Sequence, residues 1–520
     1  MKWHWKIIVG VAFLLVLILV LNIGLNWWIK FQLPKIINEK NESSYVITYK
    51  KIDVSLLDSN IKANDIVIIP KTALTDTINK SGIYAKVKSV EVKEFKLWSL
   101  LFSDKIKARS ITINTPKLIF YKKSQKSGNY SSKVRSSVVA PFEKIITVSD
   151  IYLDHGDVKI IDSQTNKALL SVQNVKLQLN GIVITETILK NTVPFYFQNY
   201  AFTCDSLYYR ASTFYHVKTH AIKTSKSDLI VNHFELIPEY SRAAFVKKIP
   251  QEKDLFTVRS TAIVVQKMKW GFKQQDFFFH SQCVALNDLI ANIYRSKIPV
   301  DDLKKKPLYN KLLRDLKFDL KLDTLKITNA LLQYEEEKSF DKGAGKLTFS
   351  KFNLTATHIR SGFKQQKLAD LQININCRFM NTSPLSVNWR FNVMDKSDGF
   401  KIKGAIRNFE VEKIIPFSKP YMNVTAKGIL NEMYFNFTGN DRKNQGTFSV
   451  KYDDLKLTVY KKEDRKKKNK LLTFVANLFV KNDTKKKLKE AQINVDRIPE
   501  KSFYNFLWRS IAEGLKKILI

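Results

Sequence analysis

The chain has 520 residues, with 87 basic and 48 acidic side chains and a net charge of +39. Its hydrophobic content of 44% excludes a disordered chain, and its 16 glycines and 13 prolines exclude a collagen-like or low-complexity one. A chain this long exceeds one compact core, so several domains or one elongated body are expected. The positive charge suits anionic lipid head groups or nucleic acid, or it reflects a background bias toward Lys, Asn and Ile.

The first predicted element is a membrane-spanning helix at residues 7–29, which carry no charged side chain. A helix of this length extends about 34 Å at ~1.5 Å per residue, and a bilayer core is about 30 Å thick. The aromatic residues expected at the two membrane interfaces are Trp3, Trp5, Trp27 and Trp28. A cleaved signal peptide is the alternative. It would have a shorter apolar region followed by small residues, whereas Lys30–Pro34 follow here.

Residues 1–30 are therefore interpreted as an uncleaved signal anchor. The short N-terminal tail is expected to stay in the cytoplasm, because long domains translocate largely regardless of their charge. The rest of the chain would then lie outside the cytoplasm.

Short runs of alternating apolar and polar residues fill the chain from Tyr45 to Val495. In one such run, Leu371 and Ile373 share a face, while Gln372 and Asn374 share the other. A period of two predicts strands with one solvent-exposed polar face and one apolar face. The predicted fold is mainly β, an elongated antiparallel twisted sheet.

Two β blocks are predicted, at residues 31–284 and 317–496. Between them, residues 285–316 are predicted to form a helical interruption, with helices at Leu286–Arg295 and Leu308–Leu316. Few segments read as amphipathic helices, so the sheet must fold on itself or cover its apolar face with something other than protein.

Residues 497–520 are predicted to form an amphipathic helix. Its apolar residues recur at helical spacing: Phe503, Leu507, Ile511, Leu515 and Ile518. Two interpretations remain open. In the first, the helix docks on the end of the β body. In the second, it lies on a membrane surface or gates an opening.

No pattern in the chain predicts an enzyme, a metal site or a cofactor. His216 and His220 share a strand face, but carboxylate or cysteine partners at matching spacing are lacking. The Gly343–Leu347 stretch departs from a phosphate-binding loop at its first glycine and at its hydroxyl position, so it is interpreted as a turn. Glu335–Glu337 is interpreted as a solvated hairpin edge. We therefore predict no catalytic residue.

Six stretches carry a likeness to a known family: Tyr49–Leu56 (YKKIDVSL), Ile61–Ile68 (IKANDIVI), Val90–Leu97 (VEVKEFKL), Ile111–Leu118 (ITINTPKL), Phe318–Tyr334 and Ser502–Leu515. Together with the single anchor, they resemble AsmA-like proteins of Gram-negative envelopes, in the form found in Bacteroidetes-type bacteria. The elements of this likeness are strand patterns rather than catalytic signatures.

The resemblance implies a single-pass inner-membrane protein with its body in the periplasm. Such proteins are thought to form a curved, taco-like β-groove that carries phospholipid acyl chains between two membranes, as chorein-type bridge proteins do in eukaryotes. The family offers no catalytic residue and no cofactor to carry over. The expected partners are phospholipids, the inner membrane through residues 7–29, and envelope proteins at the far end of the groove. Nucleic acid is not expected, because the body lies outside the cytoplasm.

Lipid transport or envelope homeostasis is thus the expected function. The predicted groove-lining contacts are Leu371, Ile373, Ile375, Val387, Trp389, Phe391, Phe435 and Phe437. The structural alternative is a closed sandwich in which these side chains meet one another. The functional alternative is a structural or assembly scaffold of the envelope, whose closed β core binds a protein partner.

Overall fold

The computed structural model describes residues 45–55, 58–76, 80–96, 106–122, 146–182, 197–273, 275–461, 469, 484 and 487–519. The predicted anchor at residues 7–29 and the flanking Trp3, Trp5, Trp27 and Trp28 lie outside this part of the chain. Among the helices formed by the described residues, none combines the length and the apolar character needed to cross a membrane.

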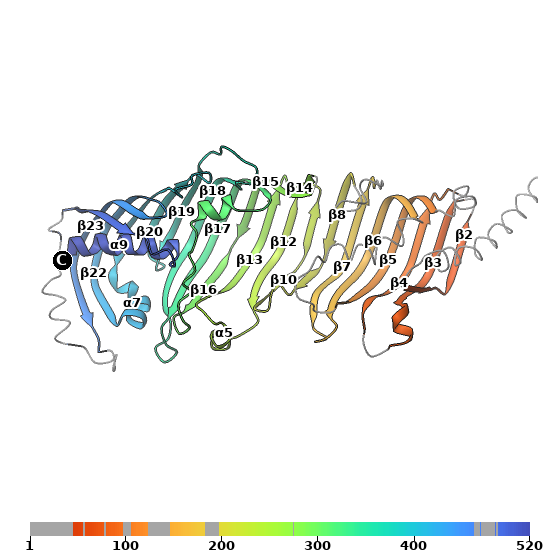
Figure 1. Ribbon diagram of the computed structural model, residues 1–520, viewed down its shortest axis with the longest axis horizontal. Coiled ribbons are helices and arrows are strands. Elements are labelled where there is room, and N and C mark those ends of the chain that lie inside the picture. The colour runs from red at the N-terminus through yellow and green to blue at the C-terminus, as the bar shows by residue number, and fades with distance from the viewer. Residues whose placement is uncertain are drawn as a thin grey trace, which may run out of the picture. The chain divides into compact units, whose positions relative to one another are not determined.

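The chain is mainly β, as the alternation predicted, and its strands form a twisted sheet (Figure 1). It divides into two compact units. Unit 1 comprises Met1–Arg210 and His220–Lys226, and unit 2 comprises Ala211–Thr219 and Ser227–Ile520. The block boundary expected at residue 284 falls inside a strand of unit 2.

Unit 1 contains β1 (Tyr45–Thr48), β2 (Lys51–Ser55), β3 (Asn60–Pro70), the 3-10 helix η1 (Lys71–Leu74), β4 (Gly82–Lys93), β5 (Ile106–Lys122), β6 (Ile146–Asp162), β7 (Ala168–Asn180), β8 (Asn199–Cys204), β9 (Ser206–Tyr209) and β11 (Ile222–Ser225).

Unit 2 begins with β10 (Tyr215–Thr219), β12 (Leu229–Pro238), α5 (Arg242–Lys248), β13 (Asp254–Gln266), β14 (Lys269–Lys273), β15 (Asp276–Asn287), β16 (Ile290–Ser296) and α6 (Tyr309–Arg314). It continues with β17 (Asp319–Glu337), β18 (Gly345–Arg360), β19 (Leu371–Phe379), β20 (Ser383–Phe391), β21 (Phe400–Glu410), the 3-10 helix η4 (Val411–Ile414), α7 (Ile415–Met422), β22 (Val424–Gly439), β23 (Lys443–Val459), β24 (Lys489–Asp496) and α9 (Phe503–Leu519).

The sheets are mixed, so the prediction of a purely antiparallel sheet is wrong. Strands β5 and β6 pair in parallel, and β17 pairs in parallel with both β15 and β16. A parallel pair needs a connection that returns the chain to the same end of the sheet. In unit 2, the segment of residues 297–318, which contains α6, makes this return before β17 begins.

The predicted helix at Leu286–Arg295 is also wrong, because these residues end β15 and form most of β16. Strands β13 and β17 pair with this stretch on its two sides, and their hydrogen bonds override its local helical pattern. Near the predicted helix at Leu308–Leu316, the structure has the short helix α6.

Each unit has a row of backbone irregularities that crosses its strands, and we name this row the crease. Its non-glycine residues with positive φ lie at matching register on neighbouring strands: Asp65, Thr115, His155 and Asn174 in unit 1, and His233, Asp288, Asn329 and Lys351 in unit 2. Register shifts occur along the crease between β6 and β7 and between β17 and β18. A bulge of this kind bends its strand and increases the local twist. Asn, Asp and His tolerate positive φ better than other side chains do.

Side-chain hydrogen bonds connect the crease of unit 2 across its strands. Asn329 Nδ2 donates to Asp288 Oδ1 at 2.8 Å, and Thr261 Oγ1 donates to Asp288 Oδ2 at 3.0 Å. The backbone N–H of Asn329 donates to Asn353 Oδ1 at 3.0 Å. Polar side chains therefore replace the ladder hydrogen bonds that the bulges interrupt.

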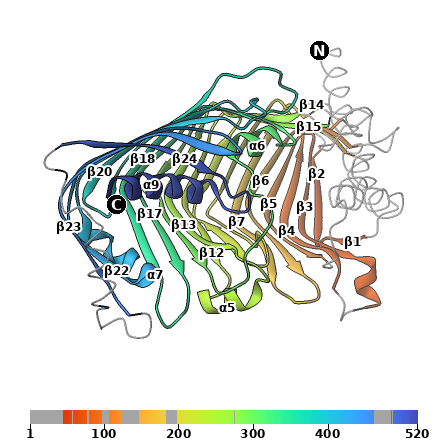
Figure 2. The same cartoon turned by 60° about the vertical axis from the view of Figure 1, so that its left-hand side comes forward.

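The C-terminal helix α9 packs on β23 and β24, as the docking interpretation predicted. Figure 2 shows the C-terminal strands of unit 2 curving around it. Its buried face includes Phe503, Phe506 and Ile518.

We predict that Asn329→Val lowers the free energy of unfolding by about 1–3 kcal/mol, because a β-branched residue is strained at the φ of +53° found there. Asn329→Gly, which accepts this φ but loses the hydrogen bond to Asp288, should cost about 1 kcal/mol. Chemical unfolding compares the two variants. Equal losses would show that backbone strain at the crease is not the cause.

Candidate functional site

A continuous row of apolar side chains crosses the sheet of unit 2 on one face. Each member is the direct cross-strand partner of the next, and we call this row the apolar ladder. Its members from β12 to β24 are Val231, Ile263, Leu286, Ile327, Leu354, Ile375, Val387, Gly404, Phe435, Phe448 and Ala491.

A second row runs beside the apolar ladder on the same face. Its members are Leu229, Val265, Val284, Leu325, Ala356, Ile373, Trp389, Ile402 and Phe437. Directly opposed side chains on paired strands lie about 5 Å apart, so the two rows form a continuous apolar band that runs across the strands.

The burial of the apolar ladder changes along its length. From Val231 to Val387 its side chains are only half-buried, although they are large and apolar. At the C-terminal strands, Phe435 is 5% exposed and Phe448 is 0% exposed. One end of the band is therefore a closed protein core, and the other end leaves part of its apolar surface accessible.

Helix α9 is the element that closes the buried end. The ring of Phe503 stacks on Trp389 with a centroid distance of 4.5 Å and an interplanar angle of 6°. Tyr309 of α6 meets the edge of Trp389 at 5.2 Å. A Cβ atom at Gly514 would lie 2.3 Å from Phe448, so only glycine permits this close approach of α9 to the sheet.

The predicted groove-lining residues fall into two groups. Five lie in the core that includes residues of α9, namely Leu371, Trp389, Phe391, Phe435 and Phe437. The other three, Ile373, Ile375 and Val387, are half-buried, and of these Ile373 and Val387 pack at the margin of that core. The sequence analysis missed the half-buried members on β12 to β18, because the register that aligns them depends on pairing between distant strands.

Unit 1 carries its own row of the same kind. Its members are Ile52, Ala63, Val90, Ile113, Leu153, Leu177 and Phe202. Within this row only Ile52 is fully buried. Each unit therefore has a partly accessible apolar row, and in both units it results from the alternation of apolar and polar residues along the strands.

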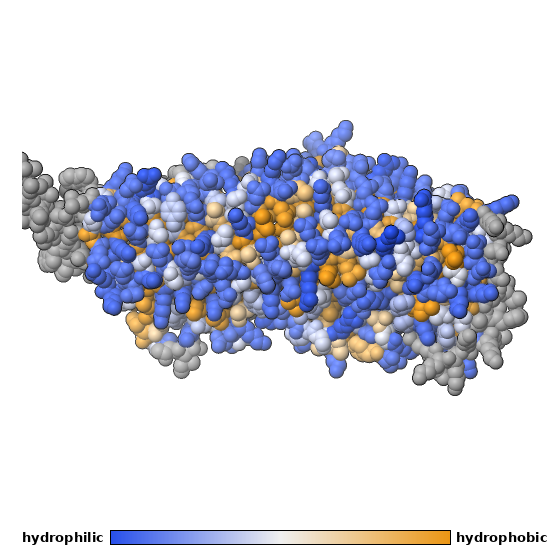
Figure 3. Space-filling view, turned by 180° about the vertical axis from the view of Figure 1, so that it is seen from behind, coloured by the Kyte–Doolittle hydropathy of each residue, from blue (hydrophilic) through white to orange (hydrophobic). Residues whose placement is uncertain are grey.

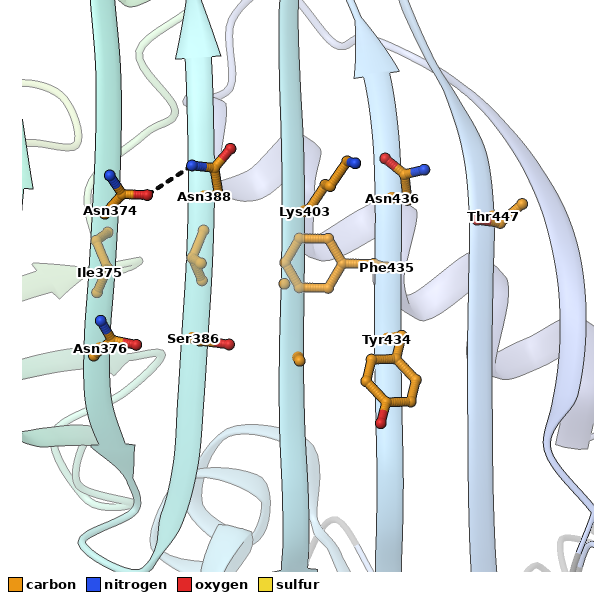
Figure 4. Close-up of a pocket in the computed structure, with 13 residues that line it drawn as sticks. Asn374, Ile375, Asn376, Ser386, Asn388, Lys403, Tyr434, Phe435, Asn436 and Thr447 are labelled. Atoms are coloured by element: carbon orange, nitrogen blue, oxygen red, sulfur yellow. Dashed lines mark hydrogen bonds between the residues drawn. The ribbon is translucent and has the colours of Figure 1, made fainter.

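Polar side chains project from the opposite face of the strands. Figure 3 shows one side of the molecule, where polar side chains predominate and apolar ones form separate patches. On β19–β23 these polar side chains enclose a trough with a volume of about 410 Å³ (Figure 4). We call it the amide trough.

The amide trough has two walls. One is formed by Asn374, Asn388, Lys403, Asn436 and Thr447, which are successive cross-strand partners, and the other by Asn376, Ser386, Ala405 and Tyr434. Its floor is the backbone of the apolar ladder, whose side chains point the other way. Asn388 Nδ2 donates to Asn374 Oδ1 at 2.6 Å within the first wall.

The glutamates expected at a solvated hairpin edge are instead part of a buried polar network, which corrects that prediction. Arg242 donates to both carboxylate oxygens of Glu335, at 2.8 and 3.0 Å, and Tyr294 donates to Glu337. Burial raises the pKa of Glu335, but the hydrogen bonds from Arg242 and Asn292 outweigh it and hold the pKa below its ordinary value. Each of these carboxylates has a partner, as expected of a network that stabilises the fold.

The two histidines of the conceivable metal pair lie in different units. His216 Nδ1 lies 2.8 Å from Glu239 Oε1. Among the described residues, no group of three His, Cys, Asp or Glu side chains is arranged to hold a metal ion.

No protein-family model matches this chain. No curated protein matches its sequence either.

We predict that Phe503→Ala destabilises the closed end of the band by about 3–5 kcal/mol, because it removes the ring stacked on Trp389 and leaves a cavity. Hydrogen exchange of the α9 amides should become faster. The neighbouring Tyr504→Ala is the control: Tyr504 is 62% exposed, and its loss should cost less than about 1 kcal/mol. Similar exchange in both variants would contradict the packing described for α9.

We predict that Glu335→Gln costs about 1.5–3 kcal/mol at neutral pH, because it removes the charged acceptor of Arg242. The pKa of Glu335 is lower in the folded than in the unfolded chain, so its stabilisation is complete above the ordinary value near 4.5 and is lost as the pH falls through the folded value. The difference in the free energy of unfolding between wild type and Glu335→Gln should therefore become smaller at acidic pH.

Urea unfolding at several pH values measures the difference in the free energy of unfolding between wild type and Glu335→Gln. Glu410→Gln, which removes an exposed carboxylate 3.5 Å from Lys413, should change stability little at any pH. If the stability difference for Glu335→Gln stayed constant as the pH fell, the ion pair of Glu335 with Arg242 would not be the cause of its lowered pKa.

Proposed function

We propose that the protein binds phospholipid acyl chains on the half-buried part of the apolar ladder, between β12 and β20 of unit 2. The observation that carries the proposal is the row of large apolar side chains from Val231 to Val387, which protein covers only in part. Extended apolar surface of this kind is costly in water and typical of a surface that binds an apolar partner.

An acyl chain matches this surface in shape and in energy. Seven strands, from β12 through β13, β15, β17, β18 and β19 to β20, carry the accessible part of the ladder, which extends about 29 Å at ~4.8 Å per strand. Each buried CH₂ group contributes ~0.8 kcal/mol, so a long chain is held well. Because the surface is continuous and nondirectional, the chain can slide along it while its head group stays in water.

Helix α9 would then act as the end wall of the lipid path. We assign Trp389, Phe391 and Phe435 to the protein core under α9, and Ile327 and its upstream neighbours on the ladder to the lipid contact. The proposal includes no catalytic residue and no cofactor.

We place this body in the periplasm, on an inner-membrane anchor at residues 7–29, as part of lipid transport or envelope homeostasis in an AsmA-like protein. The support for this placement is the uncharged segment with its flanking tryptophans, together with the sequence resemblance.

A scaffold that binds an envelope protein is the second candidate. The closed core that includes α9 favours it, because at that end the apolar face is satisfied by the protein itself. The two candidates differ in what contacts the half-buried part of the ladder: an acyl chain, or a protein partner.

We predict that a phospholipid with a photoactivatable acyl chain crosslinks to residues of the apolar ladder on β12–β18 of the full-length protein. Ile327→Asp should reduce this crosslinking about tenfold or more, because a carboxylate beside the chain cancels the burial of two or more CH₂ groups. Peptide mass spectrometry maps the crosslinks.

The matched control is Thr328→Asp, which adds the same charge to the neighbouring, exposed position of β17. It should leave the crosslinking unchanged. Crosslinks confined to residues 7–29, or an equal loss of crosslinking in Ile327→Asp and Thr328→Asp, would contradict the lipid proposal. Crosslinks to a second protein at the ladder would favour the scaffold.

A further inference from the structure

The amide trough on β19–β23 is a polar site that the acyl-chain proposal does not use. It lies on the face opposite the apolar ladder, and its lining includes the asparagines Asn374, Asn376, Asn388 and Asn436. Asparagine is depleted in strands, so four of them in one patch of sheet are not explained by strand propensity. All four are exposed and add nothing to the buried core.

The walls of the trough offer neutral hydrogen-bonding groups in both directions. Each asparagine amide donates and accepts, and so do the hydroxyls of Ser386, Thr447 and Tyr434. The matching ligand group is a hydroxyl, which also donates and accepts. Lys403 is the single cation among the lining residues, so the trough lacks the row of positive charges that a phosphodiester chain requires.

The trough has the shape of a channel for a chain-like ligand. Its walls are side chains two residues apart along each strand, roughly 6.7 Å, and five strands give it a length of roughly 19 Å. The small residues Ser386, Gly404 and Ala405 leave it open in the middle. Tyr434 borders it, and its hydroxyl donates to Glu432 at 2.9 Å, which fixes the ring beside the trough.

A peptide fits this channel less well than a glycan does. Its groups repeat every ~3.3 Å when extended, whereas the wall side chains repeat with the strand spacing of ~4.8 Å. A sugar chain offers hydroxyls at both of its edges for the two walls, and apolar C–H faces for the ring of Tyr434. We propose that the amide trough binds a neutral glycan chain, with Asn388 and Asn436 as its central hydrogen-bonding residues (Figure 4).

Saturation-transfer NMR on the full-length protein tests this proposal with maltohexaose, chitotetraose and mannohexaose as probes, and with inorganic phosphate as the anion probe. The detergent must lack a sugar head group, because alkyl maltosides would compete for the site. At least one oligosaccharide should receive saturation at millimolar concentration. The double variant Asn388→Leu/Asn436→Leu should weaken its binding on the order of tenfold or more, because two hydrogen-bonding side chains are lost.

Ser386→Trp should abolish binding by filling the trough from an exposed position, with little effect on folding. Asn494→Leu is the matched control. It removes an exposed amide from the neighbouring strand β24, where Asn494 accepts from Gln445, outside the trough.

Three results would overturn the proposal. One is the absence of saturation for every oligosaccharide, and another is equal loss in Asn494→Leu and the double variant. The third is binding of phosphate alone that disappears in Lys403→Gln, which would make the trough an anion site. Phospholipid crosslinking at the apolar ladder is measured on the same variants, so failure of the glycan proposal is distinguished from failure of the lipid proposal.

Discussion

The structure depends on the need to cover one apolar face of a long alternating sheet. Every strand of unit 2 that contributes to the apolar ladder projects its apolar side chains to the same side, and the register joins them into one band. At the C-terminal strands, α9 and α6 complete a buried core, in which Phe503 stacks on Trp389. From Val231 to Val387 the side chains of the apolar ladder stay half-buried, and this difference in burial supports the proposed lipid contact.

The crease gives the sheet its curvature without interrupting the band. His233, Asp288 and Asn329 have positive φ at one register on neighbouring strands, and the bulge at Asn329 bends its strand there. Hydrogen bonds from side chains such as Asn329 and Thr261 stabilise these bulges. Farther along unit 2, the C-terminal strands curve around α9, which contacts several of their side chains (Figure 2).

The two faces of the sheet thus offer two kinds of chemistry a few ångströms apart. One face carries a continuous apolar band, and the hydrophobic effect that drives apolar burial imposes no direction on a contact. The other face carries discrete amides and hydroxyls, whose hydrogen bonds are directional. A strand supplies both at once because its side chains alternate, so a single strand such as β20 contributes Val387 to the ladder and Asn388 to the amide trough.

The features that depend on residues close together in the chain could be predicted from the amino-acid sequence. The period of two predicted a mainly β chain and which residues of one strand share a face, and the helical spacing from Phe503 to Ile518 predicted α9. The tertiary structure alone decided the features that depend on distant pairing: the parallel pairs of β17, the strand at Ile290–Ser296 where a helix was expected, and the burial of Glu335. The burial of the predicted groove-lining residues also could not be predicted. It depends on where α9 docks, and α9 lies more than a hundred residues from Trp389 in the chain. Local periodicity fixes the direction of a side chain, whereas its cover is set by long-range packing that no local pattern contains.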